Sequence, residues 1–298
     1  MTGLDPASVE APGTAEFVDV GDVTLHTVVA GPADGEPVVL LHGFPENWYA
    51  WHDLIGPLAA AGYRVIVPDQ RGYNRSDKPD PVSAYRLDAL AGDVTGLLDA
   101  VGAGDAHVVG HDWGALVAWW LALHDPDRLR SLAALNVPHP TAFRRALLTD
   151  PRQLRRSWYG LFFQLPRLPE FLARRNGWQG AVDSMADTCR PDAFDDVDFD
   201  RYRRAWSVEG AFRSMVNWYR AVVRHPARPR RDRIDVPTLV LWGADDAFLR
   251  RSLATRSVAY CDRGRLVLWE DATHWLHHEH PDRVAEELRR QFAAADAA

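Results

Sequence analysis

Short apolar runs alternate with longer stretches of helical periodicity along most of this chain. The runs are rich in β-branched residues and are bounded by Gly, Pro and Asp, which is typical of strands. We predict strands at 23–29, 38–41, 64–67, 107–109, 131–135, 238–241 and 266–269. Four of them are continuously apolar, as in PVVLLHG and PTLVLWG, which is expected of strands buried on both faces. The pattern therefore predicts an α/β fold with a mostly parallel central sheet flanked by helices.

The strand signal disappears between about residues 136 and 235, although predicted strands flank this stretch on both sides. The stretch is rich in Arg, Trp, Phe and Pro and has helical spacing. We therefore predict a helical cap, or lid, at 138–232, inserted into a core domain made of 1–137 and 233–298. The first fifteen or so residues and the AAADAA tail are expected to be frayed.

Composition excludes several classes of function. The net charge of -7 comes from 34 basic and 41 acidic residues spread along the chain, without a basic stripe or polybasic anchor. We therefore expect neither a nucleic-acid nor a membrane partner. The first residues lack the basic start and apolar run of a signal peptide, so we expect a cytoplasmic protein. We expect a monomer or a homodimer. Only Cys189 and Cys261 are present, which rules out a disulfide framework and a Cys-based zinc site.

The segment HVVGHDWGALVAWWLAL combines a strand, a tight turn and a helix. In its turn, Gly110 and Gly114 flank Asp112 in the G-x-nucleophile-x-G spacing, with aspartate where esterases and lipases carry serine. The turn leaves room only for small residues at the two glycine positions. Asp112 also precedes a helix, whose N-terminus keeps a carboxylate ionised. The spacing alone also occurs in structural loops, but the flanking strand and helix favour a nucleophile.

An aspartate nucleophile indicates a particular chemistry. Attack by serine on a saturated carbon would leave an ether, which a neighbouring base and water could not hydrolyse. Attack by a carboxylate leaves an ester, whose carbonyl carbon accepts water. The residue type therefore points to displacement at sp³ carbon, as in epoxides, alkyl halides and haloacids.

The remaining catalytic candidates follow later strands. His274, in DATHWLHHEHPDRV, follows the last predicted strand and precedes a helix, where a base is expected. In LWGADDAFL, the spacing G-x-x-D favours Asp246 over the adjacent Asp245 as the acid that orients His274. The order nucleophile, acid, histidine is the one found in α/β-hydrolases.

Three more histidines, His277, His278 and His280, follow the predicted base and suggest a metal site. The chain has no HExxH motif, so we expect solvated residues at a helix start, with no metal and no cofactor. After the predicted strand 38–41, the turn HGFPENWYAW supplies one half of an oxyanion hole. The backbone N–H groups of Phe44 and Trp113 are the expected donors.

Several motifs together resemble the soluble epoxide hydrolases of the α/β-hydrolase superfamily. They are HGFPENWYAW, DQRGYNRSDKP, VGHDWGALVAW, SWYGLFFQLP, NWYRAV and the pair GADDAFL and HWLHHEHP. The similarity extends from about residue 17 to the end of the chain. In that family two lid tyrosines bind and protonate the epoxide oxygen, and Tyr159 and Tyr219 match them here. The resemblance implies hydrolysis of an epoxide to a vicinal diol through an ester on Asp112.

The expected substrate is a small apolar epoxide that contacts Phe44, Pro45, Trp113 and Trp158. One alternative is a haloalkane or haloacid dehalogenase, whose halide needs N–H donors such as those of Trp113 and a lid tryptophan, Trp158 or Trp178. A tyrosine pair favours the epoxide, because an alkoxide leaving group needs an acid and a halide does not. A non-catalytic ligand-binding protein of the same fold is the alternative from a different class.

Overall fold

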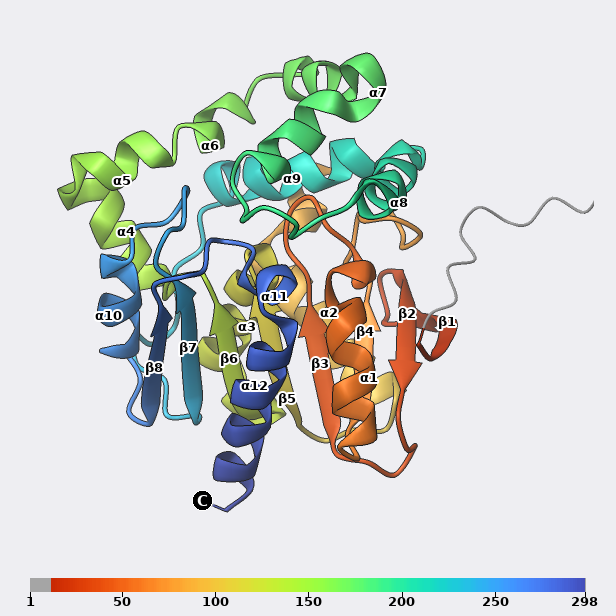
Figure 1. Cartoon of the computed structure of the whole chain (residues 1–298), viewed down its shortest axis with the longest axis vertical. Coiled ribbons are helices and arrows are strands. Elements are labelled where there is room, and N and C mark those ends of the chain that lie inside the picture. Colours follow the sequence, from red (N-terminus) through yellow and green to blue (C-terminus); the bar gives the residue numbers. More distant parts are fainter. Residues whose placement is uncertain (1–11, 298) are drawn as a thin grey trace, which may run out of the picture.

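The computed structural model describes residues 12–297, and its centre is one eight-stranded sheet with the order β1-β2-β4-β3-β5-β6-β7-β8 (Figure 1). The strands β1 and β2 pair antiparallel, as do β2 and β4, and all other neighbours pair parallel. The strands are β1 (Thr14–Asp19), β2 (Thr24–Ala30), β3 (Pro37–Leu41), β4 (Arg64–Pro68), β5 (Ala106–His111), β6 (Leu129–Leu135), β7 (Thr238–Gly243) and β8 (Gly264–Trp269).

All seven predicted strands are confirmed, as β2 to β8, with ends that differ by at most two residues. The strand β1 was missed. Five of its six residues are exposed, and it is held through backbone pairing with β2, which requires no apolar pattern in the sequence. The expectation of frayed ends was therefore wrong for residues 14 and 15, while residues 1–11 lie outside the described range. It was also wrong at 293–296, which belong to the last helix.

Helices cover both faces of the sheet. Figure 1 shows α1 (His52–Ala60) and α12 (Pro281–Asp296) in front of it, with α2 (Leu87–Ala100) and α3 (Trp113–His124) behind. The remaining core helices are α10 (Ser252–Val258), the short α11 (Leu276–Glu279) and the 3₁₀ turns at Trp48–Trp51, Val82–Tyr85 and Pro126–Arg128. Ten of the twelve residues of α3 are buried, so this helix lies in the middle of the core.

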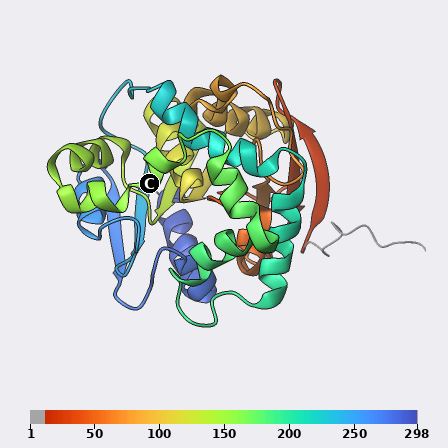
Figure 2. The ribbon, with the colours of Figure 1, turned by 90° about the horizontal axis from the view of Figure 1, so that it is seen from above.

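Six helices stand between β6 and β7, over the carboxyl ends of the parallel strands (Figures 1 and 2). They are α4 (Pro140–Thr149), α5 (Pro151–Arg156), α6 (Tyr159–Phe162), α7 (Leu168–Ala186, interrupted at residues 175–178), α8 (Asp196–Ser207) and α9 (Ala211–Arg224). The predicted helical character of 138–232 is therefore confirmed, and the division into core and cap domains stays a prediction. None of the helices within residues 12–297 is long and apolar enough to cross a membrane.

Candidate active site

Asp112 stands between the end of β5 and the start of α3, in a left-handed backbone conformation with φ 46° and ψ -121°. The glycines two residues before and after Asp112 cannot be replaced by a larger residue, because backbone atoms surround them. A Cβ on Gly114 would lie 2.1 Å from the carbonyl oxygen of Leu41, and a Cβ on Gly110 would lie 2.4 Å from the carbonyl carbon of Gly114. Neither distance is sterically possible, so the predicted steric role of both glycines is confirmed.

The carboxylate of Asp112 lies against the turn that follows β3. The backbone N–H of Phe44 donates a hydrogen bond to Asp112 Oδ1 at 2.8 Å. Gly43 allows this approach, since a Cβ there would lie 2.4 Å from Asp112 Cβ. The second predicted donor, the N–H of Trp113, forms no hydrogen bond to this carboxylate among the described residues. Its role as an oxyanion donor stays a prediction.

His274 lies between two carboxylates. Its Nε2 is 3.7 Å from Asp112 Oδ2, and its Nδ1 is hydrogen-bonded to Asp246 Oδ2 at 2.8 Å. His274 and Asp246 are almost completely buried, at 3% and 2% exposure. Asp245, in contrast, is exposed and forms an ion pair with Arg190. Of the two adjacent acids, Asp246 is thus the one that contacts the imidazole.

Asn136 is a further residue of this site, which the sequence reasoning missed. Its Nδ2 donates a hydrogen bond to Asp246 Oδ2 at 2.7 Å, and its Oδ1 accepts one from Gly243 N–H at 2.8 Å. Asn136 directly follows β6, the neighbour of β7, and has a positive φ of 52°, which asparagine tolerates. This position at a strand end was the signal that could have identified it. The side chain fixes Asp246 from the side opposite its backbone donors.

The side chains of Asp112, His274 and Asp246 shift one another's protonation equilibria. Burial alone would raise the pKa of Asp112, but the hydrogen bond and charge of His274 lower it overall. Burial would lower the pKa of His274, but the charge of Asp246 and the contact with Asp112 raise it to about 10. At neutral pH the imidazole of His274 is therefore protonated and lies between the carboxyl groups of Asp112 and Asp246.

Tyr159 and Tyr219 come from different cap helices and meet near the elbow. Their ring centroids are 5.9 Å apart in an edge-to-face arrangement. Tyr219 also packs edge-to-face on Trp113 and on Phe44, at 4.9 and 5.2 Å. Burial, and after it the charge of Asp112, raises the pKa of both phenols. Both tyrosines are therefore neutral O–H donors beside the predicted nucleophile.

The other predicted pocket residues differ in their positions. Pro45 follows Phe44 through a cis peptide bond, and its carbonyl oxygen accepts a hydrogen bond from the indole of Trp206 at 2.5 Å. Trp158 is 63% exposed and its ring contacts Phe162, so the structure does not bring it to the other site residues. The reason is helical geometry, because Trp158 and Tyr159 are consecutive and project about 100° apart.

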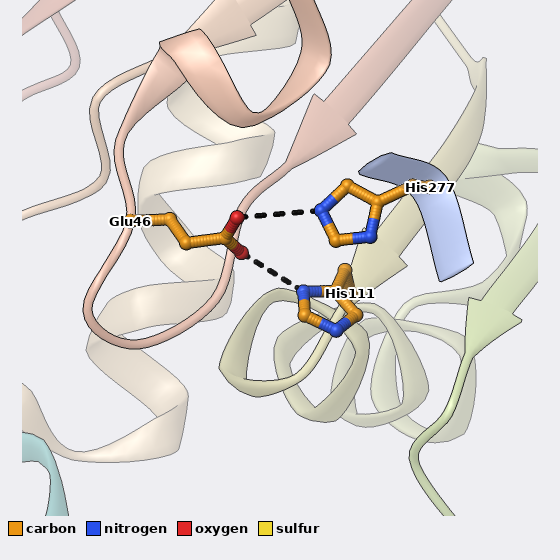
Figure 3. Close-up of side chains that lie close together, drawn as sticks. All are labelled: Glu46, His111 and His277. Carbon is orange, nitrogen blue, oxygen red and sulfur yellow. Dashed lines mark hydrogen bonds and ion pairs between the residues drawn. The ribbon is translucent and has the colours of Figure 1, made fainter. Parts of the chain in front are cut away.

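A buried acid with three histidines adjoins the site, and Figure 3 shows its centre. Glu46 is hydrogen-bonded to His111 Nδ1, His278 Nε2 and His277 Nε2 at 2.9, 2.7 and 3.3 Å. His277 is 1% exposed and the side chain of His278 3%, so the expectation of solvated residues was wrong for both. Their hydrogen bonds to Glu46 replace part of the lost hydration, while Nδ1 of His277 is buried without a hydrogen-bond partner among the described residues. His280, one quarter exposed, remains partly in solvent.

Glu46 also connects to the catalytic loop through His111. The other nitrogen of His111, Nε2, is 3.0 Å from the carbonyl oxygen of His274. Both nitrogens of His111 therefore face oxygen atoms that can accept a hydrogen bond. Burial opposes ionisation of Glu46, but the surrounding histidines, first His277, hold its pKa well below the usual value. The pair Glu46 and His111 thus joins the elbow to the turn after β3 and to the histidine loop.

Two groups of side chains have the composition of a metal site within the described residues. Ligand atoms of Glu46, His111 and His277 lie within 4.8 Å of one another, as do those of Glu36, His107 and Asp296. In the first group the atoms are already hydrogen-bonded to one another. In the second, Arg130 places its guanidinium on Glu36.

Comparison with known proteins gives a consistent result. A family model described as alpha/beta hydrolase fold matches residues 36–281. The chain is 43% identical, over 89% of its length, to the AB hydrolase superfamily protein YfhM of Bacillus subtilis, of which it covers 93%. It is 36% identical, over 92% of its length, to epoxide hydrolase A of Mycobacterium tuberculosis, of which it covers 96%. A crystal structure of Bacillus megaterium epoxide hydrolase with an inhibitor matches with a TM-score of 0.86 and 25% identity, over 93% of this chain and 100% of that one.

Proposed function

This chain belongs to the alpha/beta hydrolase fold family and has epoxide hydrolases among its relatives, and we propose that it hydrolyses a small apolar epoxide to a vicinal diol. One observation carries the proposal. A carboxylate at the elbow faces an imidazolium at 3.7 Å, the neutral phenol of Tyr219 packs on the adjacent Trp113, and the phenol of Tyr159 packs on Tyr219. A carboxylate nucleophile suits attack at saturated carbon, and the phenols suit a leaving oxygen that must gain a proton.

In the first half-reaction Asp112 attacks one epoxide carbon and the C–O bond to that carbon breaks. Phe44 N–H holds Oδ1, so Oδ2 is the oxygen that forms the new bond. The electron pair of the broken bond goes to the epoxide oxygen, which takes a proton from Tyr159 or Tyr219. The products are a hydroxyalkyl ester on Asp112 and a phenolate, which recovers its proton through solvent from His274.

The second half-reaction hydrolyses this ester. Neutral His274, oriented by Asp246, takes a proton from a water molecule whose oxygen adds to the ester carbonyl carbon. Negative charge develops on Oδ1, which Phe44 N–H already contacts. Collapse of this intermediate releases the diol and restores the Asp112 carboxylate and the imidazolium.

The first step prepares the second electrostatically. In the free enzyme, contact with ionised Asp112 helps to keep His274 protonated. Ester formation removes that negative charge, so the pKa of His274 falls and the imidazole becomes available as a base. The base is therefore activated only after the intermediate exists.

A dehalogenase is the less well supported alternative. A departing halide needs indole N–H donors, and the two lid tryptophans named for this role, Trp158 and Trp178, do not supply them. Trp158 is largely exposed, and the indole of Trp178 donates its N–H to Ser207 at 2.7 Å. The contacts of Tyr159 and Tyr219 beside the elbow favour an oxygen leaving group instead.

The covalent intermediate provides the test. His274→Gln should still form the ester but fail to hydrolyse it. Intact-protein mass spectrometry after addition of styrene oxide should then show a mass increase equal to the whole substrate, on the peptide that contains Asp112. Asp112→Ala should remain unmodified, and the wild-type protein should release the diol.

Two outcomes would contradict the proposal. An unmodified His274→Gln protein that demonstrably binds the epoxide would exclude the covalent step on Asp112. Release of halide from a matched alkyl bromide, without turnover of styrene oxide, would establish the dehalogenase instead. A wild-type protein that binds both compounds and converts neither would be a ligand-binding protein.

A further inference from the structure

The outer surface of the cap exposes many large apolar side chains. Eight of the twelve exposed large hydrophobic residues within 12–297 lie between residues 148 and 172. They are exposed by 38% to 81% and comprise Leu148, Leu154, Trp158, Leu161, Leu165, Leu168, Phe171 and Leu172. Such a concentration exceeds the scattered single apolar residues that are normal on a protein surface. We call this surface, with the arginines described next, the outer cap face.

The exposed fractions of these side chains show that they face solvent. Leu154 belongs to α5, Leu161 belongs to α6, and Trp158 and Leu165 lie in the turns on either side of α6. Tyr159, between them, packs inward on Phe248. Figures 1 and 2 show α5, α6 and the start of α7 as the outermost layer of the cap, away from the sheet. The apolar side of these helices therefore faces solvent.

Arginines alternate with these apolar residues. All eight arginines between residues 144 and 175 are exposed, and none forms an ion pair within the described residues: Arg144, Arg145, Arg152, Arg155, Arg156, Arg167, Arg174 and Arg175. The only two acids of the stretch, Asp150 and Glu170, are paired with Arg250 and Arg220 from outside it. A protein with a net charge of -7 thus presents one strongly positive face.

We propose that the outer cap face docks onto the surface of an anionic lipid bilayer. Leucines with Trp158 and Phe171 suit the boundary between headgroups and acyl chains, and exposed guanidinium groups that form no ion pair suit lipid phosphates. A second copy of the chain fits poorly, because eight arginines would meet eight arginines. Nucleic acid would pair with the arginines but leave the leucines uncovered. Along the sequence, leucines separate the arginines, so that no continuous basic stretch is present, although both kinds of residue are exposed on the cap.

Flotation with vesicles tests this surface in the full chain. The wild-type protein should float with vesicles of phosphatidylglycerol and phosphatidylcholine in equal parts, but not with vesicles of phosphatidylcholine alone. Binding should fall at about 1 M salt, where the screening length is about 3 Å. In one variant Leu161→Ser is combined with Phe171→Ser, and in another Arg152, Arg155 and Arg174 are changed to Glu. Each should weaken binding by more than about tenfold.

A matched control distinguishes an effect of the outer cap face from an effect of the protein's net charge. Arg86, Arg256 and Arg289 are exposed and lie outside the face, so changing all three to Glu alters the net charge equally and should leave flotation unchanged. Circular dichroism of each variant establishes that it is folded. A wild-type protein that ignores anionic vesicles, or an equal loss in the control, overturns the proposal. A wild-type dimer that both face variants convert to monomer would assign the face to a second copy and overturn it as well.

Discussion

Replacing Asp246 by Asn is expected to destabilise the protein and to change how its stability depends on pH. Both carboxylate oxygens are fully used. Oδ1 accepts hydrogen bonds from Phe248 and Leu249 N–H at 2.7 and 2.8 Å, and Oδ2 contacts His274 Nδ1 and Asn136 Nδ2 at 2.8 and 2.7 Å. An amide offers one accepting oxygen and one NH₂ group. In either orientation of the new side chain, two donors therefore face an NH₂ group.

The structure also indicates how much unfolding free energy Asp246→Asn should lose. Removing the carboxylate leaves a buried imidazolium without its main partner, which costs about 3–5 kcal/mol. The elevation of the His274 pKa from 6.5 to about 10 corresponds to about 5 kcal/mol of preferential stabilisation of the imidazolium. Because the folded pKa is the higher one, this stabilisation is complete below pH 6.5 and is lost as the pH rises toward about 10. Without Asp246 this loss should be much smaller.

Urea unfolding measures both effects. Between pH 6.5 and about pH 9 the wild-type protein should lose about 3 kcal/mol of unfolding free energy, and Asp246→Asn should start lower and change less. Asp245→Asn is the matched control, since it removes one charge of an exposed ion pair and should change stability by less than about 1 kcal/mol. If Asp246→Asn keeps the wild-type stability and pH slope, or if Asp245→Asn causes the larger loss, the assignment of Asp246 is refuted.

Two further predictions concern the phenols and the buried acid. Tyr159→Phe or Tyr219→Phe should slow ester formation in single-turnover experiments. In the double variant the rate of ester formation should fall about 10²–10⁴-fold, because general acid catalysis contributes that much. Unchanged epoxide turnover in the double variant would favour the dehalogenase. Glu46→Gln should lower the unfolding free energy near neutral pH by about 3–5 kcal/mol, because it removes the buried carboxylate to which three histidines are hydrogen-bonded. The pKa of Glu46 is lower in the folded protein than in the unfolded chain, so the loss of unfolding free energy in this variant should shrink as the pH falls below 4.5. Urea titrations at several pH values measure this, and a loss that does not depend on pH would argue against an ionised Glu46.

Sequence periodicity was sufficient for most of the sheet because β5 and β7 are buried along their whole length and must be apolar throughout. It failed for β1, whose exposed residues leave no pattern. The orientation of α6 was also not predictable, because a helix of four residues is too short for periodicity to indicate which side faces inward. That is why Tyr159 and Trp158 were both assigned to the pocket.

The candidate active site was predictable where chemistry and topology coincide. Asp112 and Asp246 follow β5 and β7, and a parallel sheet brings such positions to one edge. Asn136 occupies the equivalent position after β6, but an amide has no signature of hydrolytic chemistry. The contact between Glu46 and His277 spans 231 residues. Nothing local in the sequence identifies partners so far apart, so only the folded chain shows why those histidines are buried.

The left-handed backbone at Asp112 has an evolutionary consequence. Any residue other than glycine costs about 1–3 kcal/mol in such a conformation. Mutation to glycine would remove this backbone strain and would also abolish the proposed reaction. In a lineage that no longer depends on turnover, the backbone geometry gives no reason to keep a non-glycine residue at this position. An aspartate retained at the elbow is therefore a sign of continuing selection for chemistry, and thermostability screens of this protein need an activity criterion to keep it.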